Sequence, residues 1–198
     1  MVWDAEQWPF RPPMFIRQWL FEQKVKQFAP NPASSNLSGR QGTQGAWLVL
    51  YDGKDPWQAE LAKYLAQYRR PDYFCQTLGL VRHNQAVLNS FHAQELTHAL
   101  LPPDRILSLA RSRPFDLCVN LCPVDNPPLE YLVLSASSPT KIGVNRQKSS
   151  ARYNLELGLK LAGAKPSLRA FLQHLASLGL HTVQENKLQT IHPQPIKP

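Results

Sequence analysis

The apolar run Ala46-Trp-Leu-Val-Leu-Tyr51 constrains the fold of this chain more than any other segment. Consecutive apolar residues without alternation are typical of a strand covered on both faces, as in a parallel sheet. A helix start follows at once, because Asp55, Pro56 and Gln58 have the residue types of an N-cap, a first helical position and the third position of a capping box. Strand, short loop and helix in direct succession indicate an α/β unit.

The alternation continues along the chain. The first helix is predicted to bury a stripe made of Trp57, Leu61, Tyr64, Leu65 and Tyr68. Further strands are predicted at 73–81, 86–91, 115–121, 140–144 and 153–159, and further helices after Pro103, Pro127 and Pro166. Because parallel neighbours need a crossover helix, the pattern predicts a single Rossmann-like three-layer α/β sandwich with a mostly parallel sheet, preceded by an N-terminal amphipathic helix.

The ends of the chain differ from this pattern. We predict an N-terminal helical extension over 1–29, a flexible linker over 30–45, the Rossmann-like domain over 46–182 and a Pro-rich mobile tail over 183–198. The extension holds an amphipathic helix over Met14–Phe28 after Pro13, and an aromatic set of Trp3, Trp8 and Trp19. We expect this helix to pack on the domain; the alternative is an exposed aromatic patch for a protein partner.

Composition bears on location. The three cysteines are an odd number, which favours reduced thiols. No apolar run approaches the roughly 18 residues of a membrane span, and the first residues lack the basic and apolar regions of a signal peptide. We therefore expect a cytoplasmic protein without a membrane span, and the pattern predicts no particular oligomeric state.

Two loops are the candidates for a site. Ligands of open parallel sheets bind beyond the carboxyl ends of the strands, where the strand order reverses. This rule selects Asp52–Asp55 and Cys122–Asn126. The candidate catalytic carboxylates are Asp55, Asp52 and Asp125, and the candidate ligand-binding residues are Gly53, Lys54, Asn120 and Asn126. Asp55 also fits a purely structural N-cap, which we favour, and Gly53 is expected to supply a positive φ.

Signatures of cofactors are missing. The chain contains neither G-x-G-x-x-G nor a P-loop, although a helix N-terminus still offers weak phosphate binding. Cys118 and Cys122, if both lie in one strand, are roughly 13 Å apart, too far for one tetrahedral ion. We predict no metal and no cofactor, and buried thiols; a nucleophilic Cys122 activated by His92 is the alternative.

Positive charge is concentrated in one region. The formal net charge is +8, and residues 140–169 carry seven basic residues against one acid, Glu156. The candidate anion-binding residues are Lys141, Arg146, Lys148 and Arg152. A solvated basic surface is the simplest interpretation; an anionic ligand or RNA is the functional one.

Four segments carry a family resemblance: Phe115-Asp-Leu-Cys-Val-Asn-Leu121, Leu129-Glu-Tyr-Leu-Val-Leu-Ser-Ala136, Thr140-Lys-Ile-Gly-Val144 and Arg152-Tyr-Asn-Leu-Glu-Leu157. Over roughly residues 46–178 the chain resembles a bacterial family of small α/β proteins classed as a domain of unknown function. It also resembles the N-terminal Rossmann-like half of heptosyltransferase-type glycosyltransferases. In those enzymes a Gly-Asp pair in the first βα loop supplies the catalytic base, which the resemblance places at Gly53-Lys54-Asp55, with Lys54 inserted.

Together these features predict a non-catalytic Rossmann-like binding or scaffold protein. One alternative is a glycosyltransferase-like or small hydrolase enzyme that uses the first βα loop. The other is an RNA- or ribosome-associated protein that binds through 140–169.

Overall fold

The computed structural model describes residues 12–28, 45–67, 73–81, 89–144 and 152–158, together with Phe171 and Gln173. The chain divides into two compact units, Met1–Gly158 and Leu159–Pro198. In the second unit Phe171 and Gln173 are helical and Phe171 is buried. The predicted linker over 30–45 lies outside the described residues except for Gly45, which begins the first strand, and so do the tail and the domain boundary at 182. The helices and strands whose bounds the structure gives all lie in the first unit.

The sheet has six strands, all parallel, in the order β3-β2-β1-β4-β5-β6. The strands are β1 (Gly45–Asp52), β2 (Tyr73–Val81), β3 (Ser90–His92), β4 (Leu117–Asn120), β5 (Thr140–Val144) and β6 (Leu155–Leu157). The helices are α1 (Met14–Val25), α2 (Pro56–Gln67), α3 (Asp104–Arg111) and α4 (Pro127–Ser135), with a 3-10 turn, η3 (Ala93–Glu95). The predicted α/β fold is confirmed.

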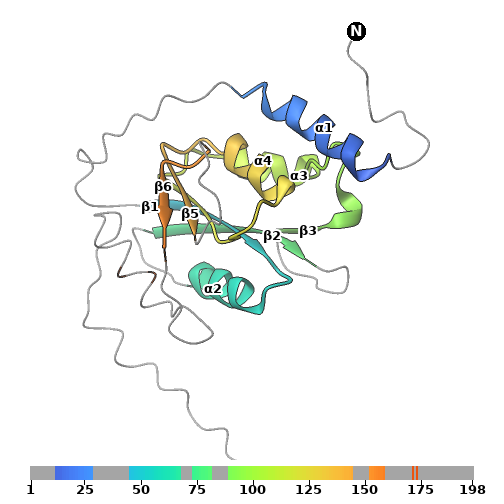
Figure 1. Ribbon diagram of the computed structural model, residues 1–198. Helices are drawn as coiled ribbons and strands as arrows, with labels where there is room; N and C mark the ends of the chain where they lie inside the picture. Colours follow the sequence, from blue (N-terminus) through green and yellow to red (C-terminus); the bar gives the residue numbers. More distant parts are fainter. Residues whose placement is uncertain are drawn as a thin grey trace, which may run out of the picture. The chain divides into compact units, whose positions relative to one another are not determined.

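Helices cover both faces of the sheet (Figure 1). α2 lies on one face, and α1, α3 and α4 lie on the other. β1 and β4 are buried on both sides, which is why their sequences are almost wholly apolar. Leu48 and Leu50 of β1 point into the α3–α4 side of the core, together with Cys118 of β4. The result is a Rossmann-like sandwich with three layers.

The apolar stripe of α2 is rotated from its predicted position. Its buried residues are Gln58, Leu61, Ala62 and Leu65, while Trp57 and Tyr64 are only half-buried. The prediction that these two aromatic residues belong to the core was wrong. The face that α2 turns to β1 and β2 is centred on Gln58, Leu61, Ala62 and Leu65, so Trp57 and Tyr64 lie at its margin. Tyr68 lies outside the described residues.

Two glycines make room for neighbours. A Cβ on Gly79 of β2 would come within 2.2 Å of the Tyr51 ring. The Tyr51 ring therefore packs where a side chain at position 79 would otherwise lie. A Cβ on Gly53 would come within 2.8 Å of Val81 Cγ1, and Gly53 does not have the positive φ that we predicted. Gly53 N donates to Leu80 O at 2.8 Å, and the glycine is needed because the turn passes this close to β2.

α1 packs on the domain with one face and exposes another. Phe21 is 1% exposed, its ring lies 6.4 Å from that of Tyr131 in α4, and Arg17 Nε donates to His98 O at 3.2 Å. Phe15 and Trp19 are 72% and 58% exposed. The expected packing is therefore found, although not for Trp19; Trp3 and Trp8 lie outside the described residues. Among the described helices, none has the length and hydropathy of a bilayer-spanning segment.

The two faces of α1 give opposite predictions for substitution. Phe21→Ala should lower the free energy of unfolding by about 3–5 kcal/mol, because it removes a fully buried ring and leaves a cavity. Phe15→Ala, six residues earlier in the helix and exposed, should change it by no more than about 0.5 kcal/mol. Urea unfolding followed by circular dichroism measures both, and equal losses would show that α1 does not dock through Phe21.

Candidate functional site

The strand order reverses between β1 and β4, so the two loops selected from the sequence lie at the same edge of the sheet. Leu50 pairs with Asn120, and Leu121 N extends the ladder by donating to Leu50 O at 2.9 Å. Beyond this point Asn126 Nδ2 donates to Asp52 Oδ2 at 3.4 Å. The structure thus brings the two loops into side-chain contact, which their separation in sequence does not reveal.

The Asp52 carboxylate closes the turn after β1. Its Oδ1 accepts from Lys54 N at 2.9 Å, and its Oδ2 accepts from Asn126. The Asp52 amide in turn donates to Gln58 Oε1 at 2.9 Å. Asp52 is therefore part of a hydrogen-bonded turn and a link between the two loops.

Asp55 caps α2. Its Oδ1 accepts from Trp57 N at 3.0 Å, and its Oδ2 accepts from Gln58 Nε2 at 3.1 Å. The capping box differs from the predicted one, since the Gln58 amide oxygen accepts from Asp52 N rather than from Asp55 N. Gln58, 2% exposed, spans the turn because it bonds to residues at both ends of it. Both oxygens of the proposed catalytic base thus have structural partners.

This edge of the sheet is poorly suited to phosphate. Anions bind helix N-termini through free amide groups. α2 begins with Pro56 and α4 with Pro127 and Pro128, which have no N–H to donate. The amides of Lys54 and Trp57 already donate to aspartates. The charged residues of the two loops are three acids, Asp52, Asp55 and the exposed Asp125, and one base, the exposed Lys54. Their formal charge is therefore negative.

A buried polar cluster next to this edge was not predicted. We call it the Glu130 network; its members are Asn120, Glu130, Arg152 and Tyr153. Glu130 Oε1 accepts from Tyr153 Oη at 2.8 Å and from Asn120 Nδ2 at 3.4 Å, and Oε2 accepts from Arg152 Nη1 at 3.3 Å. Asn120 Nδ2 also contacts Tyr153 Oη at 2.8 Å, and Asn120 Oδ1 accepts from Cys122 N at 3.1 Å.

The Glu130 network joins β4, α4 and the segment that leads into β6. Glu130 and Asn120 are fully buried. Burying a carboxylate without hydrogen-bond donors would destabilise the fold, so the three donors to Glu130 are what allows it to lie here. The signal in the sequence is Glu130 itself, a single acid inside the otherwise apolar run of α4. Asn120 and Arg152, predicted to bind ligands, here bind Glu130.

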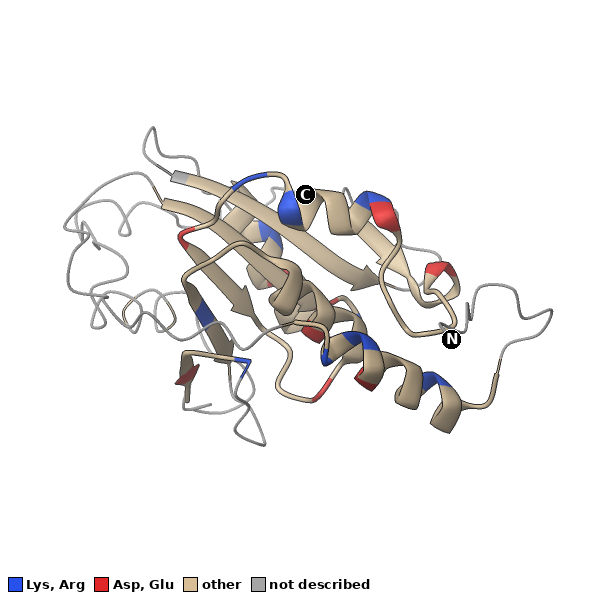
Figure 2. Cartoon of the chain, turned by 90° about the horizontal axis from the view of Figure 1, so that it is seen from above, with Lys and Arg blue, Asp and Glu red and all other residues tan. Residues whose placement is uncertain are grey.

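The predicted basic patch is described only in part. Arg146 and Lys148 lie outside the described residues. Arg152 is paired with Glu130, so its guanidinium is already engaged, and burial lowers the pKa of Lys141. In Figure 2 blue and red segments are spread over several elements, and some helices carry both colours. Anion binding by this segment stays a prediction.

The thiols are enclosed. Cys118 and Cys122 are buried and form no disulfide, and burial raises the pKa of Cys118 to about 12. His92 lies on β3, three strand spacings from β4, which amounts to roughly 14 Å at about 4.8 Å per strand. A Cys122–His92 nucleophile is therefore not formed. Among the described residues no group of three His, Cys, Asp or Glu side chains could hold a metal ion.

The Glu130 network predicts unequal effects of removing two tyrosine hydroxyls. Tyr153→Phe removes the donor at 2.8 Å from a buried carboxylate and should lower the free energy of unfolding by about 1–3 kcal/mol. Tyr131→Phe is the matched control, because Tyr131 is also buried and its hydroxyl has no hydrogen bond to a described residue. Chemical unfolding compares them; a loss as large for Tyr131→Phe would contradict the assigned role of the network.

Burial also orders the reactivity of the cysteines. At pH 8 iodoacetamide should label Cys75, which is partly buried, well before Cys118 and Cys122, because the thiolate is the reactive form and the other two thiols are fully buried. Mass spectrometry of the labelled peptides, with and without denaturant, measures the order. Labelling of Cys118 in the folded protein at the rate of Cys75 would contradict the burial.

Comparisons with protein-family models, with curated proteins and with solved structures found no match. The resemblance to the bacterial family and to the N-terminal half of heptosyltransferase-type enzymes stays a prediction.

Proposed function

We propose that this protein is a non-catalytic Rossmann-like binding module, whose ligand lies at the edge where the β1 and β4 loops meet. The observation that carries the proposal is the pair of carboxylates at this edge. Asp52 and Asp55 accept hydrogen bonds on both of their oxygens, from the turn, from α2 and from Asn126. A general base needs an oxygen directed at the substrate, and these are directed at the protein itself.

The same contacts favour one class of ligand. Asp52 and Asp55 lie at this edge, and the exposed Asp125 belongs to the β4 loop, whereas both helices begin with proline and the amides of Lys54 and Trp57 are already bonded. A ligand that presents hydrogen-bond donors or positive charge fits this edge better than a nucleotide does. The glycosyltransferase-like alternative requires a nucleoside-diphosphate sugar and a free base, and neither requirement is favoured by these contacts. The RNA alternative rests on 140–169, and its described members do not favour it.

A second observation favours a scaffold role for α1. Phe15 and Trp19 lie four residues apart on the helix, and both are more than half exposed, although Phe21 anchors the opposite face. Large exposed aromatic residues on a docked helix are typical of protein contacts. We therefore keep the protein partner predicted for this helix as part of the proposal.

Amide chemical shifts test the ligand class. We expect spermidine, a cationic donor-rich probe, to shift the amide signals of Gly53, Lys54 and Asn126 saturably in nitrogen–proton correlation spectra, while inorganic phosphate does not. Asp52→Asn should weaken the spermidine effect, because it removes a carboxylate charge and keeps the shape of the side chain. Asp104→Asn, in the first turn of α3, is the matched control for net charge.

Two results would contradict the proposal. Saturable shifts of the same amides with phosphate or with a nucleoside-diphosphate sugar would contradict the proposed ligand class. Turnover of a nucleotide sugar that Asp55→Ala abolishes, in a protein that still folds, would contradict the non-catalytic function. Asp55→Ala should otherwise only destabilise α2, by about 1 kcal/mol, as expected for a lost N-cap.

A further inference from the structure

Among the strands that the structure describes, β3 is the terminal one on its side of the sheet. A terminal strand presents backbone groups that another chain can pair with. Gly79 N of β2 donates to Asn89 O at 3.4 Å, so the backbone groups of Asn89 and Phe91 face β2. Because neighbouring residues of a strand alternate, the backbone groups of Ser90 and His92 face outward, away from the sheet.

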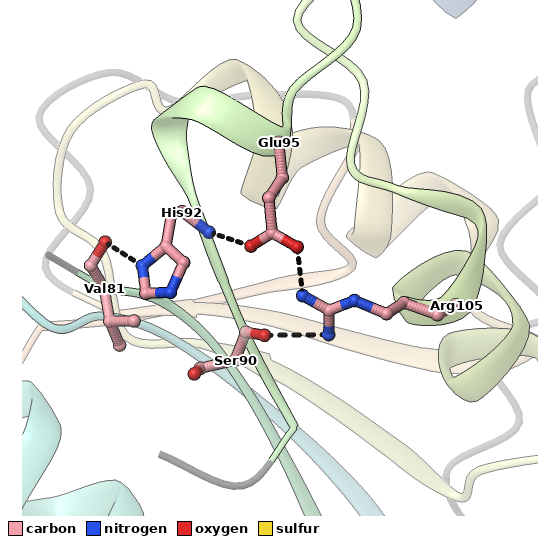
Figure 3. Close-up of polar contacts among 5 residues, drawn as sticks. All are labelled: Val81, Ser90, His92, Glu95 and Arg105. Atoms are coloured by element: carbon pink, nitrogen blue, oxygen red, sulfur yellow. Dashed lines mark hydrogen bonds and ion pairs between the residues drawn. The ribbon is translucent and has the colours of Figure 1, made fainter. Parts of the chain in front are cut away.

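Side chains occupy two of these outward groups (Figure 3). Arg105 Nη1, from α3, donates to Ser90 O at 2.9 Å. Glu95 Oε2, from η3, accepts from His92 N at 2.7 Å. The two side chains also bind each other, through Arg105 Nη2 and Glu95 Oε1. One carbonyl and one amide of the edge, at alternate residues, are thereby covered by a single ion pair.

Glu95 must be ionised to accept hydrogen bonds from both Arg105 and the His92 amide. Burial alone would raise the pKa of Glu95, but the hydrogen bond from Arg105 and that from the His92 amide outweigh it and hold the pKa below its usual value. Glu95 therefore stays ionised and remains an acceptor for both donors at neutral pH.

We propose that the Glu95–Arg105 pair closes the β3 edge against the addition of a strand from a second copy of this chain. A strand that paired here would need Ser90 O and His92 N, the groups that the pair occupies. A second copy is the occupant because its own β3 presents the same edge, and two such edges meet around a two-fold axis.

The alternative, that the pair exists for stability, predicts a different outcome. Arg105 is half-exposed, and an exposed ion pair contributes little to the free energy of unfolding. The two roles therefore separate in experiment: loss of the pair should change association far more than it changes the unfolding midpoint.

The test uses the full chain with Glu95→Ala and Arg105→Ala combined. Sedimentation velocity over a range of concentrations should show self-association beginning at a concentration about tenfold or more below that of the wild type. Arg111→Ala is the matched control: it lies on the same helix, and its Nη2 donates to Ser135 Oγ at 3.3 Å, away from the edge. The control should behave as the wild type.

A second measurement does not depend on the double variant. In the single variant Glu95→Ala, at a dilution where no association occurs, the His92 amide should exchange with deuterium about tenfold faster than in Arg111→Ala, because its acceptor is gone. Unchanged exchange would overturn the proposal. So would a folded double variant that associates no more than the control does.

Discussion

The parallel pairing of β1 with both β2 and β4 is the interaction on which the rest of the structure depends. β1 is buried on both faces, so its backbone groups must be satisfied by strands on both sides. The chain builds outward from β1 to β3, then returns to place β4 on the other side. This reversal brings Asp52 and Asn126 together, and it also leaves β3 as an edge that has to be closed.

The sandwich contains two polar clusters with different roles, the Glu130 network and the Glu95–Arg105 pair. The Glu130 network satisfies a carboxylate within the apolar layer beneath α4, and it ties the entry into β6 to β4. The Glu95–Arg105 pair lies at the edge of the sheet, where both side chains hydrogen-bond to the backbone of β3. Polar side chains at the predicted site likewise bond to the chain itself, and this is the observation on which our proposal of a binding function rests.

Much of the fold was predictable because its signals are local. The run 46–51, the helix start at Pro56 and the strand at 73–81 appear as β1, α2 and β2 with little change in their bounds. The stripe of α2 was misplaced, because periodicity gives a helix face but not the distance to the sheet. Gly53 was assigned a positive φ on residue type alone, whereas the closeness of Val81 explains it.

The sequence by itself determined the alternation of strands and helices, and with it the two loops at the carboxyl ends of β1 and β4. Only the tertiary structure decided what their side chains do. Asp55 was compatible with both a base and a cap, and its bonds to Trp57 and Gln58 make it a cap. Glu130 and Tyr153 are far apart in sequence, and Glu95 and Arg105 lie on different elements. The reason is physical: secondary structure follows from local backbone preferences and side-chain periodicity, whereas the partners of a polar group depend on which distant segments packing brings within hydrogen-bond distance.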